Sequence, residues 1–356
     1  MAWHGIYGHD DVVERFRLAL GRGRLASSFL FVGLEGIGKR SFALKLAQAL
    51  LCRTRPEQAM DPCGECPACV QVAAATHPDL ELVAKPKDKS FLPLELLIGD
   101  KEHRMRRGLC HGIALKPFMG GRKIAIIDDA DYLNEEGANS LLKTLEEPPP
   151  RSVLILIGTS PAKQLPTIRS RCQLIRFRPL DAQIVTRLLV EHGSVETEAE
   201  ARRLSSHCGG SLQRAAELAD AGLWAFRTQL YAQLAQPILA SGRLAKAVVA
   251  FVDEAGRDAP PRRRRARQVV GLAADFYRGL VHALCDAPPT GDAELQASVG
   301  RAMEAWPGDE LAAAACLDRC LEVAERIDRN AYLPTLLECW LDDLAGTPAD
   351  GPTSAR

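Results

Sequence analysis

A glycine-rich loop at residues 33 to 41 constrains the fold of this chain more than any other feature. The loop reads Gly-Leu-Glu-Gly-Ile-Gly-Lys-Arg-Ser and satisfies the phosphate-binding pattern G-x-x-x-x-G-K. It follows a short apolar run, Phe29 to Val32, and opens a segment of helical periodicity, Ser41 to Leu51. In that context glycines let backbone N–H groups point at a phosphate. The pattern predicts a P-loop whose nucleotide-binding residues are Gly33, Gly36, Gly38 and Lys39.

The residue after the lysine departs from this pattern. A P-loop has Ser or Thr there, and its hydroxyl holds Mg²⁺, but this chain has Arg40. A guanidinium carries only N–H donors and a permanent positive charge, so it cannot ligate a cation. The loop therefore predicts the shape of a nucleotide site that lacks part of its metal chemistry.

The first half of the chain alternates strand-like and helix-like segments. Continuous β-branched runs separated by helices predict an α/β domain with a parallel sheet covered on both faces. The third run ends at Asp128, the expected Walker B carboxylate, with Asp129 beside it, and a helix is expected over Gly137 to Glu147. The five expected strands are Phe29–Val32, Leu80–Val83, Ile124–Ile127, Val153–Ile157 and Gln173–Phe177.

After Leu180 the pattern becomes helical throughout. Three short helices are expected at 181–192, 196–208 and 211–221, and an alanine- and leucine-rich helical region follows. The tail from Gly346 is rich in Pro, Gly, Ser and Thr, a composition typical of disorder. The predicted domains are 1–178 with a cysteine-containing insertion at about 52–75, 179–221, 222–345 and a tail at 346–356.

Charge and hydropathy exclude several classes of protein. Lys plus Arg and Asp plus Glu both number 45, so no global field favours a nucleic acid or a membrane. The N-terminus has no apolar h-region and the longest aliphatic run, Val153–Ile157, is far too short to span a bilayer. We expect a cytoplasmic protein. The local basic candidates for nucleic-acid contact are the segment Lys85–Lys123 and the tract Arg262–Arg265.

Four of the eleven cysteines are clustered in the sequence Cys63-Gly-Glu-Cys66-Pro-Ala-Cys69, with Cys52 shortly before it. Two-residue gaps allow cysteines to wrap one tetrahedral Zn²⁺, and four thiolates leave no open position, so the site would be structural. An iron–sulfur cluster is the competing interpretation, although the C-x₃-C-P continuation typical of ferredoxins is missing. Unliganded cysteines are the remaining alternative.

Taken together, these motifs resemble the bacterial clamp-loader branch of the AAA+ proteins over about residues 5 to 220. The resemblance also rests on His77-Pro-Asp79, on residues 139–149 (Asn-Ser-Leu-Leu-Lys-Thr-Leu-Glu-Glu-Pro-Pro) and on Ser170-Arg171-Cys172. It implies an AAA+ domain, a helical lid and a helical collar that mediates oligomerisation. It also implies assembly with gamma/tau ATPase subunits and a delta subunit of DNA polymerase III. Such a complex uses ATP to place the sliding clamp on primer-template DNA during replication.

The resemblance assigns roles to individual residues. It implies that Arg171 is an arginine finger acting in trans on a neighbouring ATPase site, although composition alone would make it a surface arginine. Thr159 lies at the sensor 1 position. Gln213 stands where the ATPase subunits have the sensor 2 arginine. The four cysteines are implied to bind zinc.

Three departures from the ATPase pattern agree with one another: Arg40, Asp129 in place of glutamate, and Gln213 in place of arginine. Groups of this kind are individually worth orders of magnitude in rate, so we expect no intrinsic ATPase activity and weak or absent ATP binding. The favoured function is a non-hydrolysing clamp-loader subunit. The alternatives are an ATP-hydrolysing gamma/tau-type subunit and a stand-alone zinc-containing nucleic-acid-binding protein.

Overall fold

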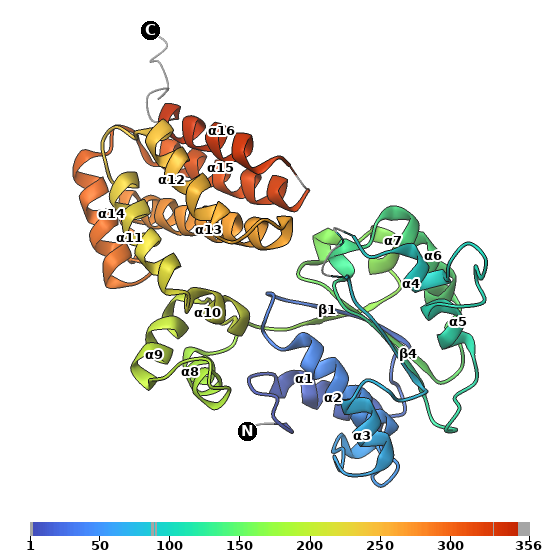
Figure 1. Cartoon of the computed structure of the whole chain (residues 1–356). Helices are drawn as coiled ribbons and strands as arrows, with labels where there is room; N and C mark the ends of the chain where they lie inside the picture. Colours follow the sequence, from blue (N-terminus) through green and yellow to red (C-terminus); the bar gives the residue numbers. More distant parts are fainter. Residues whose placement is uncertain (1–2, 87–88, 90, 330, 348–356) are drawn as a thin grey trace. The chain divides into compact units, whose positions relative to one another are not determined.

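The computed structural model describes residues 3–86, 89, 91–329 and 331–347 (Figure 1). Contacts between residues divide the chain into two compact units, Met1–Ala215 and Ala216–Arg356. The finer division into an AAA+ domain, a lid and a collar stays a prediction. Residues 348–356 of the expected tail lie outside the described part of the chain.

The first unit contains a five-stranded sheet and the helices that cover it. Its elements are α1 (Asp10–Gly21), β1 (Ser28–Val32), α2 (Lys39–Leu51), η1 (Glu57–Ala59), α3 (Pro67–Ala73), β2 (Leu80–Val83), α4 (Leu94–Ile98), α5 (Leu109–Ala114), β3 (Lys123–Ile127), η2 (Ala130–Tyr132), α6 (Glu135–Glu146), β4 (Ser152–Ile157), η3 (Pro161–Lys163), α7 (Pro166–Arg169), β5 (Gln173–Arg176), α8 (Ala182–Glu191), α9 (Glu198–His207) and α10 (Leu212–Leu218), the last of which crosses the boundary between the units.

The strands run in the order β2-β3-β4-β1-β5, and every pair is parallel. All residues of β1, β3 and β4 are buried. Strands buried on both faces favour apolar side chains, which explains the apolar runs in the sequence, and the only polar residues of these three strands, Ser28, Lys123 and Ser152, are their first residues. The five predicted strands are confirmed, with ends that differ by at most one residue.

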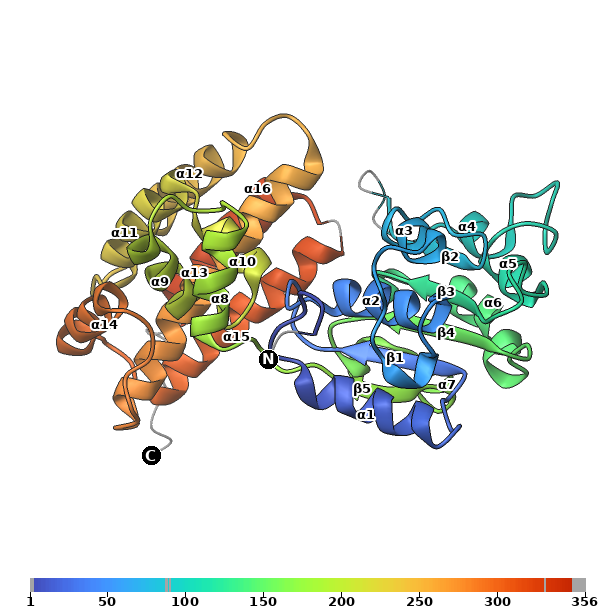
Figure 2. The same cartoon turned by 90° about the horizontal axis from the view of Figure 1, so that it is seen from below.

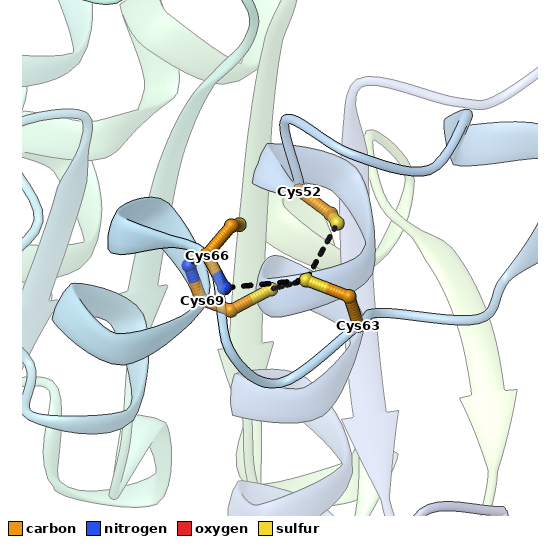
Figure 3. A group of neighbouring side chains, drawn as sticks. All are labelled: Cys52, Cys63, Cys66 and Cys69. Atoms are coloured by element: carbon orange, nitrogen blue, oxygen red, sulfur yellow. Dashed lines mark hydrogen bonds between the residues drawn. The ribbon is translucent and has the colours of Figure 1, made fainter.

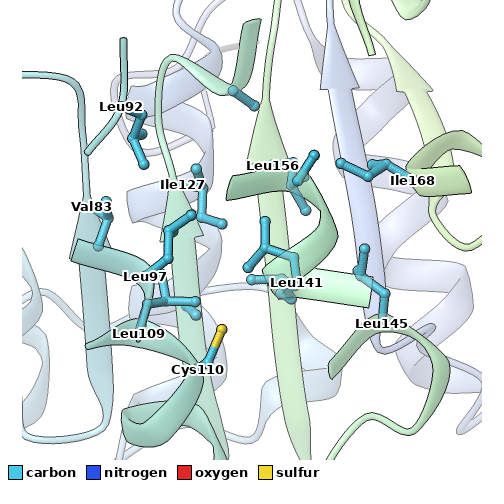
Figure 4. Close-up of a cluster of buried hydrophobic side chains, with 14 of the residues drawn as sticks. Val83, Leu92, Leu97, Leu109, Cys110, Ile127, Leu141, Leu145, Leu156 and Ile168 are labelled. Atoms are coloured by element: carbon cyan, nitrogen blue, oxygen red, sulfur yellow. The ribbon is translucent and has the colours of Figure 1, made fainter. Parts of the chain in front are cut away.

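Different side chains fill the two faces of the sheet. On one face, helices α4 to α7 pack aliphatic residues such as Leu97, Leu141 and Ile168 against the strands (Figure 4). On the other, Phe16 of α1 and Phe42 of α2 pack against the phenylalanines of β1. Figure 1 shows α1 and α2 on the side of the sheet opposite α6, and Figure 2 shows α1 and α2 in front of the strands. The carboxyl end of β1 therefore leads into the glycine-rich loop from a rigid core.

A buried ion pair closes the other end of the sheet, where β2 and β3 begin. The Asp79 side chain is fully buried, and its carboxylate accepts hydrogen bonds from the backbone N–H groups of Phe118 (2.7 Å) and Met119 (2.9 Å). Lys123 Nζ lies 3.5 Å from Asp79 Oδ1 and donates to the carbonyl of Pro78 at 2.9 Å. The His77-Pro-Asp79 motif thus anchors the loop before β3.

Replacing Asp79 with alanine is expected to destabilise the first unit by about 3–5 kcal/mol, the usual cost of removing one partner of a buried ion pair. The buried Lys123 ammonium loses its counter-charge, and two backbone donors lose their acceptor. Urea unfolding followed by circular dichroism measures the change. Glu196→Ala, which removes an exposed carboxylate of the same unit, is the control, and equal stabilities of the two variants would contradict the anchoring role.

The second unit is helical. Its helices are α11 (Ala221–Leu234), α12 (Ser241–Asp253), α13 (Ala259–Leu284), α14 (Ala293–Ala305), α15 (Glu310–Asp328) and α16 (Leu333–Gly346). The long α13 packs along α15, and α12 packs along α16, around Trp340, Phe276 and Tyr277. Across the described residues, no helix has the length and apolar content needed to cross a membrane.

The third short helix predicted from the sequence is confirmed, but it ends earlier than expected. The sequence predicts it over 211–221, whereas α10 ends at Leu218 and the next helix, α11, already starts at Ala221. The carboxylate of Asp220 accepts a hydrogen bond from Gly222 N at 2.9 Å. An aspartate in this position caps a new helix N-terminus, so the break follows from capping rather than from hydrophobic pattern.

Candidate functional site

The glycine-rich loop connects β1 to α2, as the motif requires. Its glycines adopt backbone conformations that side chains disfavour, with φ of 152° at Gly33, 74° at Gly36 and 96° at Gly38. Gly38 is the N-cap of α2. The predicted P-loop is therefore present as a backbone feature, with the start of a thirteen-residue helix behind it.

Lys39, the loop lysine, binds the loop itself. The residue is only 6% exposed, and Nζ donates to the carbonyls of Gly33 (2.7 Å) and Leu34 (2.6 Å). Burial lowers the pKa of the Lys39 ammonium below its usual value, although nearby carboxylates, Glu35 foremost, act in the opposite direction. The cation that would contact a nucleotide phosphate is thus already hydrogen-bonded within its own loop.

Arg40 makes an ion pair with the Walker B carboxylate. Its Nη1 lies 3.3 Å from Oδ2 of Asp128, at the end of β3, and the Asp128 side chain is only 16% exposed. A P-loop ATPase would use a hydroxyl at position 40 and the carboxylate at 128 to hold Mg²⁺. The residues present do not fit that ion, because one ligand is missing and a guanidinium neutralises the other.

The acidic residues after β3 divide between two environments. Asp129 has the left-handed φ of 58°, and burial, with the neighbouring charge of Asp128, raises the pKa of its carboxyl group. Asp131 accepts hydrogen bonds from Thr159 N (2.8 Å), Thr159 Oγ1 (2.5 Å) and Gln164 Nε2 (2.9 Å). The side chain at the predicted sensor 1 position, Thr159, is therefore hydrogen-bonded to Asp131.

Ser211 and the first residues of α10 contact the P-loop directly. Ser211 Oγ donates to the carbonyl of Glu35 (2.6 Å), Leu212 N donates to that of Gly36 (3.0 Å), and Gln213 Nε2 donates to Glu35 Oε1 (3.0 Å). A Cβ atom on Gly36 would lie 2.4 Å from the Cβ of Gln213. Gln213, at the sensor 2 position, is thus packed on the loop. A further contact that the sequence did not suggest joins His9 Nε2 to the Ile37 carbonyl at 2.8 Å.

The four predicted metal ligands come together at the end of α2 and the start of α3 (Figure 3). The sulfurs of Cys52, Cys63, Cys66 and Cys69 all lie within 4.8 Å of one another. Cys63 Sγ is 3.7 Å from Cys52 Sγ and 3.8 Å from Cys69 Sγ. Tetrahedral Zn–S bonds of about 2.3 Å place neighbouring sulfurs about 3.8 Å apart. The donor set therefore fits a tetrathiolate metal site.

Hydrogen bonds around this cluster favour the thiolate form of one ligand. Thr54 Oγ1 lies 3.1 Å from Cys63 Sγ, and Cys66 N donates to the same sulfur at 3.3 Å. These bonds, that of Thr54 foremost, lower the pKa of the Cys63 thiol to about 6. Cys69 is buried, which raises the pKa of its thiol, and Gln48 Nε2 of α2 donates to its carbonyl at 2.9 Å. The cluster is therefore connected to α2 in two ways: Cys52 directly follows the helix, and Gln48 of the helix is hydrogen-bonded to Cys69.

Arg171, the predicted trans-acting finger, follows α7 and lies on the protein surface. Its Nη2 donates to Glu146 Oε1 at 2.6 Å, and its Nη1 donates to the carbonyl of Thr167 (2.9 Å) and to Ser170 Oγ (3.2 Å). One third of the side chain remains exposed. It is far in the sequence from the P-loop, and its contacts are with α6 and its own turn.

The two basic segments predicted as nucleic-acid candidates differ, because the tract from Arg262 is paired within the chain and the segment Lys85–Lys123 is paired only in part. Lys123 is buried against Asp79, which removes it from any surface, and Arg122 binds Glu57 through two hydrogen bonds of 2.6 and 2.8 Å. Lys101, Arg106 and Arg107 are exposed, and Lys87 lies outside the described residues. In the second tract the pairs are Arg262–Asp253, Arg263 with the Ile327 carbonyl, Arg264–Glu217, Arg265–Asp220 and Arg267–Asp328.

The parallel sheet, the loop between β1 and α2 and the helical segment over that loop define a P-loop domain of the AAA+ class. Residues 8–181 match the protein family described as DNA polymerase III, delta subunit. Over this region, which is just under half of the chain, the protein is similar to bacterial DNA polymerase III subunits named delta′.

Individual relatives agree with this family. The chain is 39% identical over 152 residues to subunit delta′ of Pseudomonas aeruginosa, covering 43% of each chain. It is 32% identical over 195 residues to subunit delta′ of Bacillus subtilis, covering 55% of this chain and 54% of that one. It is also 32% identical over 221 residues to subunit tau of Salmonella typhimurium, covering 60% of this chain and 32% of that one. The matches thus span about half or less of these relatives.

Proposed function

We propose that this chain is a clamp-loader subunit of DNA polymerase III that does not hydrolyse ATP itself. In this proposal it assembles with gamma/tau ATPase subunits and a delta subunit, and it presents Arg171 to the nucleotide site of a neighbouring ATPase subunit. The assembly places the sliding clamp on primer-template DNA. The resemblance of its motifs and its similarity to delta′ and tau subunits support this assignment.

The Arg40–Asp128 ion pair carries the non-hydrolysing part of the proposal. Phosphoryl transfer in P-loop enzymes depends on a metal ion that bridges the β- and γ-phosphates. Here the guanidinium of Arg40 lies 3.3 Å from the carboxylate of Asp128, which would otherwise help to hold the metal ion. Three further features agree: Lys39 is bound to loop carbonyls, Asp129 has a raised pKa, and Gln213 covers the loop without an arginine.

The cysteine cluster is proposed to hold one structural Zn²⁺. Four sulfur ligands would complete a tetrahedral shell, which leaves no position for a substrate or water. The metal would fix the insertion at 52–75, in which few described apolar side chains are buried besides Met60 before α3 and Ala68 and Val72 within that helix. The role is therefore stabilisation of this insertion rather than chemistry.

The ATP-hydrolysing alternative has one observation in its favour, the 32% identity to a tau subunit. A subunit of that type needs a Lys-Ser or Lys-Thr pair in the P-loop, and Arg40 argues against it. A stand-alone nucleic-acid-binding protein would need an unpaired basic surface. The intramolecular pairing of the tract from Arg262 to Arg267 lowers the support for that class.

The purified chain is expected to release no phosphate from ATP above the enzyme-free background. Arg40 takes the place of one metal ligand and forms an ion pair with the other expected ligand, Asp128. Lys39→Ala is expected to leave ATP hydrolysis by a reconstituted clamp loader nearly unchanged, because Lys39 Nζ already binds loop carbonyls. Phosphate-release assays with and without Mg²⁺ measure both. Mg²⁺-dependent turnover by the purified chain, abolished by Lys39→Ala, would establish the ATP-hydrolysing alternative instead.

A further inference from the structure

Arg171 and Glu146 are brought together by two helices that share one hydrophobic core. Glu146 is the last residue of α6, one position after the buried Leu145. Arg171 lies between Ile168, which is 1% exposed, and Cys172, which packs against the same core cluster. Burial also raises the pKa of the Cys172 thiol to about 12. Figure 4 shows Leu141, Leu145 and Ile168 on this shared face. The backbone positions of Glu146 and Arg171 are therefore fixed by the packing of their buried neighbours in this core.

The guanidinium of Arg171 is held on one side and open on the other. Its three hydrogen bonds, to Glu146, Thr167 and Ser170, involve only the two Nη atoms. Arginine has five N–H donors, so the Nε–H and one Nη–H remain for an external acceptor. Among the described residues, no other contact engages them. A fork with two donors left suits a phosphate group, which accepts several hydrogen bonds at once.

We propose that Glu146 is a positioning residue that orients Arg171 for the nucleotide site of a neighbouring subunit. This inference rests on the proposed trans-acting role of Arg171. A long, flexible arginine on a surface otherwise samples many rotamers, and catalytic groups displaced by about 1 Å lose up to about 10²-fold in rate. In metal sites, residues that orient a ligand through a hydrogen bond are worth about 10–100-fold in affinity or activity, and we expect an effect of similar size here.

The geometry favours orientation over sequestration. An exposed ion pair is worth at most about 1 kcal/mol, so Glu146 cannot withhold Arg171 from a polyanionic partner. It can, however, reduce the number of side-chain conformations before assembly, which is the advantage of a preorganised site. The carboxylate engages Nη2 and leaves the Nε–H free, so a phosphate and Glu146 can be bound together.

The test compares Glu146→Ala, Glu146→Gln and Arg171→Ala in a clamp loader reconstituted with gamma/tau and delta subunits. Glu146→Ala is expected to lower kcat for ATP about tenfold with KM unchanged, because the finger acts in the transition state. Glu146→Gln keeps an oxygen acceptor for Nη2 and is expected to restore most of the rate. In an Arg171→Ala background, Glu146→Ala is expected to have no further effect.

Glu147 supplies the matched control, since it is the adjacent exposed carboxylate and its side chain forms no hydrogen bond or ion pair among the described residues. Glu147→Ala is expected to behave as the unmodified chain. A rate that stays equal or rises in Glu146→Ala, while Arg171→Ala lowers it, overturns the positioning role but leaves the proposed function intact. Equal losses for Glu146→Ala with and without Arg171 indicate a structural effect and also overturn it. Activity unchanged by Arg171→Ala refutes the underlying function itself.

Discussion

Arg171→Ala is expected to reduce ATP hydrolysis at the neighbouring nucleotide site by roughly 10³-fold, the lower end of the range known for arginine fingers in GTPases. The guanidinium would stabilise charge that develops on the transferred phosphoryl group, and alanine offers no donor in its place. The loss should appear in kcat rather than in ATP affinity, because the charge is greatest in the transition state.

The measurement requires that one site be observed at a time. We suggest single-turnover hydrolysis in a reconstituted clamp loader whose other ATPase sites are inactivated by substitution of their P-loop lysines. Arg169→Ala is the matched control, because Arg169 is an exposed arginine two residues away that forms no ion pair among the described residues. If Arg169→Ala greatly lowers the rate of ATP hydrolysis while Arg171→Ala changes it little, Arg169 and not Arg171 is the arginine finger. Full activity of both variants would reject a finger in this turn.

Removal of the proposed zinc is expected to unfold the insertion between α2 and α3. Metal binding contributes about 10–16 kcal/mol to the folding of zinc-finger peptides at neutral pH, and the described residues of this insertion bury few apolar side chains in compensation. We expect about one zinc per chain in the unmodified protein. Cys66→Ser should lose the metal and become sensitive to proteolysis between residues 52 and 75.

Cys285→Ser is the control for this experiment, because Cys285 is exposed and outside the cluster. It should retain both the metal and the resistance to proteolysis. If the protein contains iron and shows a visible charge-transfer band, the site is an iron–sulfur cluster and the zinc assignment is wrong. A metal-free protein that resists proteolysis equally well would reject a metal site altogether.

Much of the first unit follows from local pattern. A strand buried on both faces is mostly apolar, so β1, β3 and β4 are recognisable as apolar runs in the sequence. The short helices α4 and α5 are less predictable, because helices of five or six residues depend on tertiary packing for their stability. The end of the helix expected over 211–221 is also not visible in the hydrophobic pattern, because α10 ends at Leu218 and Asp220 caps the next helix.

The candidate sites divide in the same way. The cysteine cluster is predictable because its ligands are close in sequence and their spacing matches tetrahedral geometry. The bonds from Asp131 to Thr159 and from His9 to Ile37 are not, because nothing in the local sequence connects those residues. Lys123 belongs to a segment predicted as a basic surface, but its position at the start of a central strand places it in the interior with Asp79.

The glycine pattern alone is sufficient to predict the phosphate loop, since only glycine readily adopts the φ angles that the turn requires. The sequence is also sufficient to show that Arg40 cannot ligate a metal, because that is a property of the guanidinium itself. That Arg40 pairs with Asp128, and that Glu146 meets Arg171, depends on the folded chain. Each pair joins residues distant in sequence, and only the sheet register and the shared core bring their charges within contact.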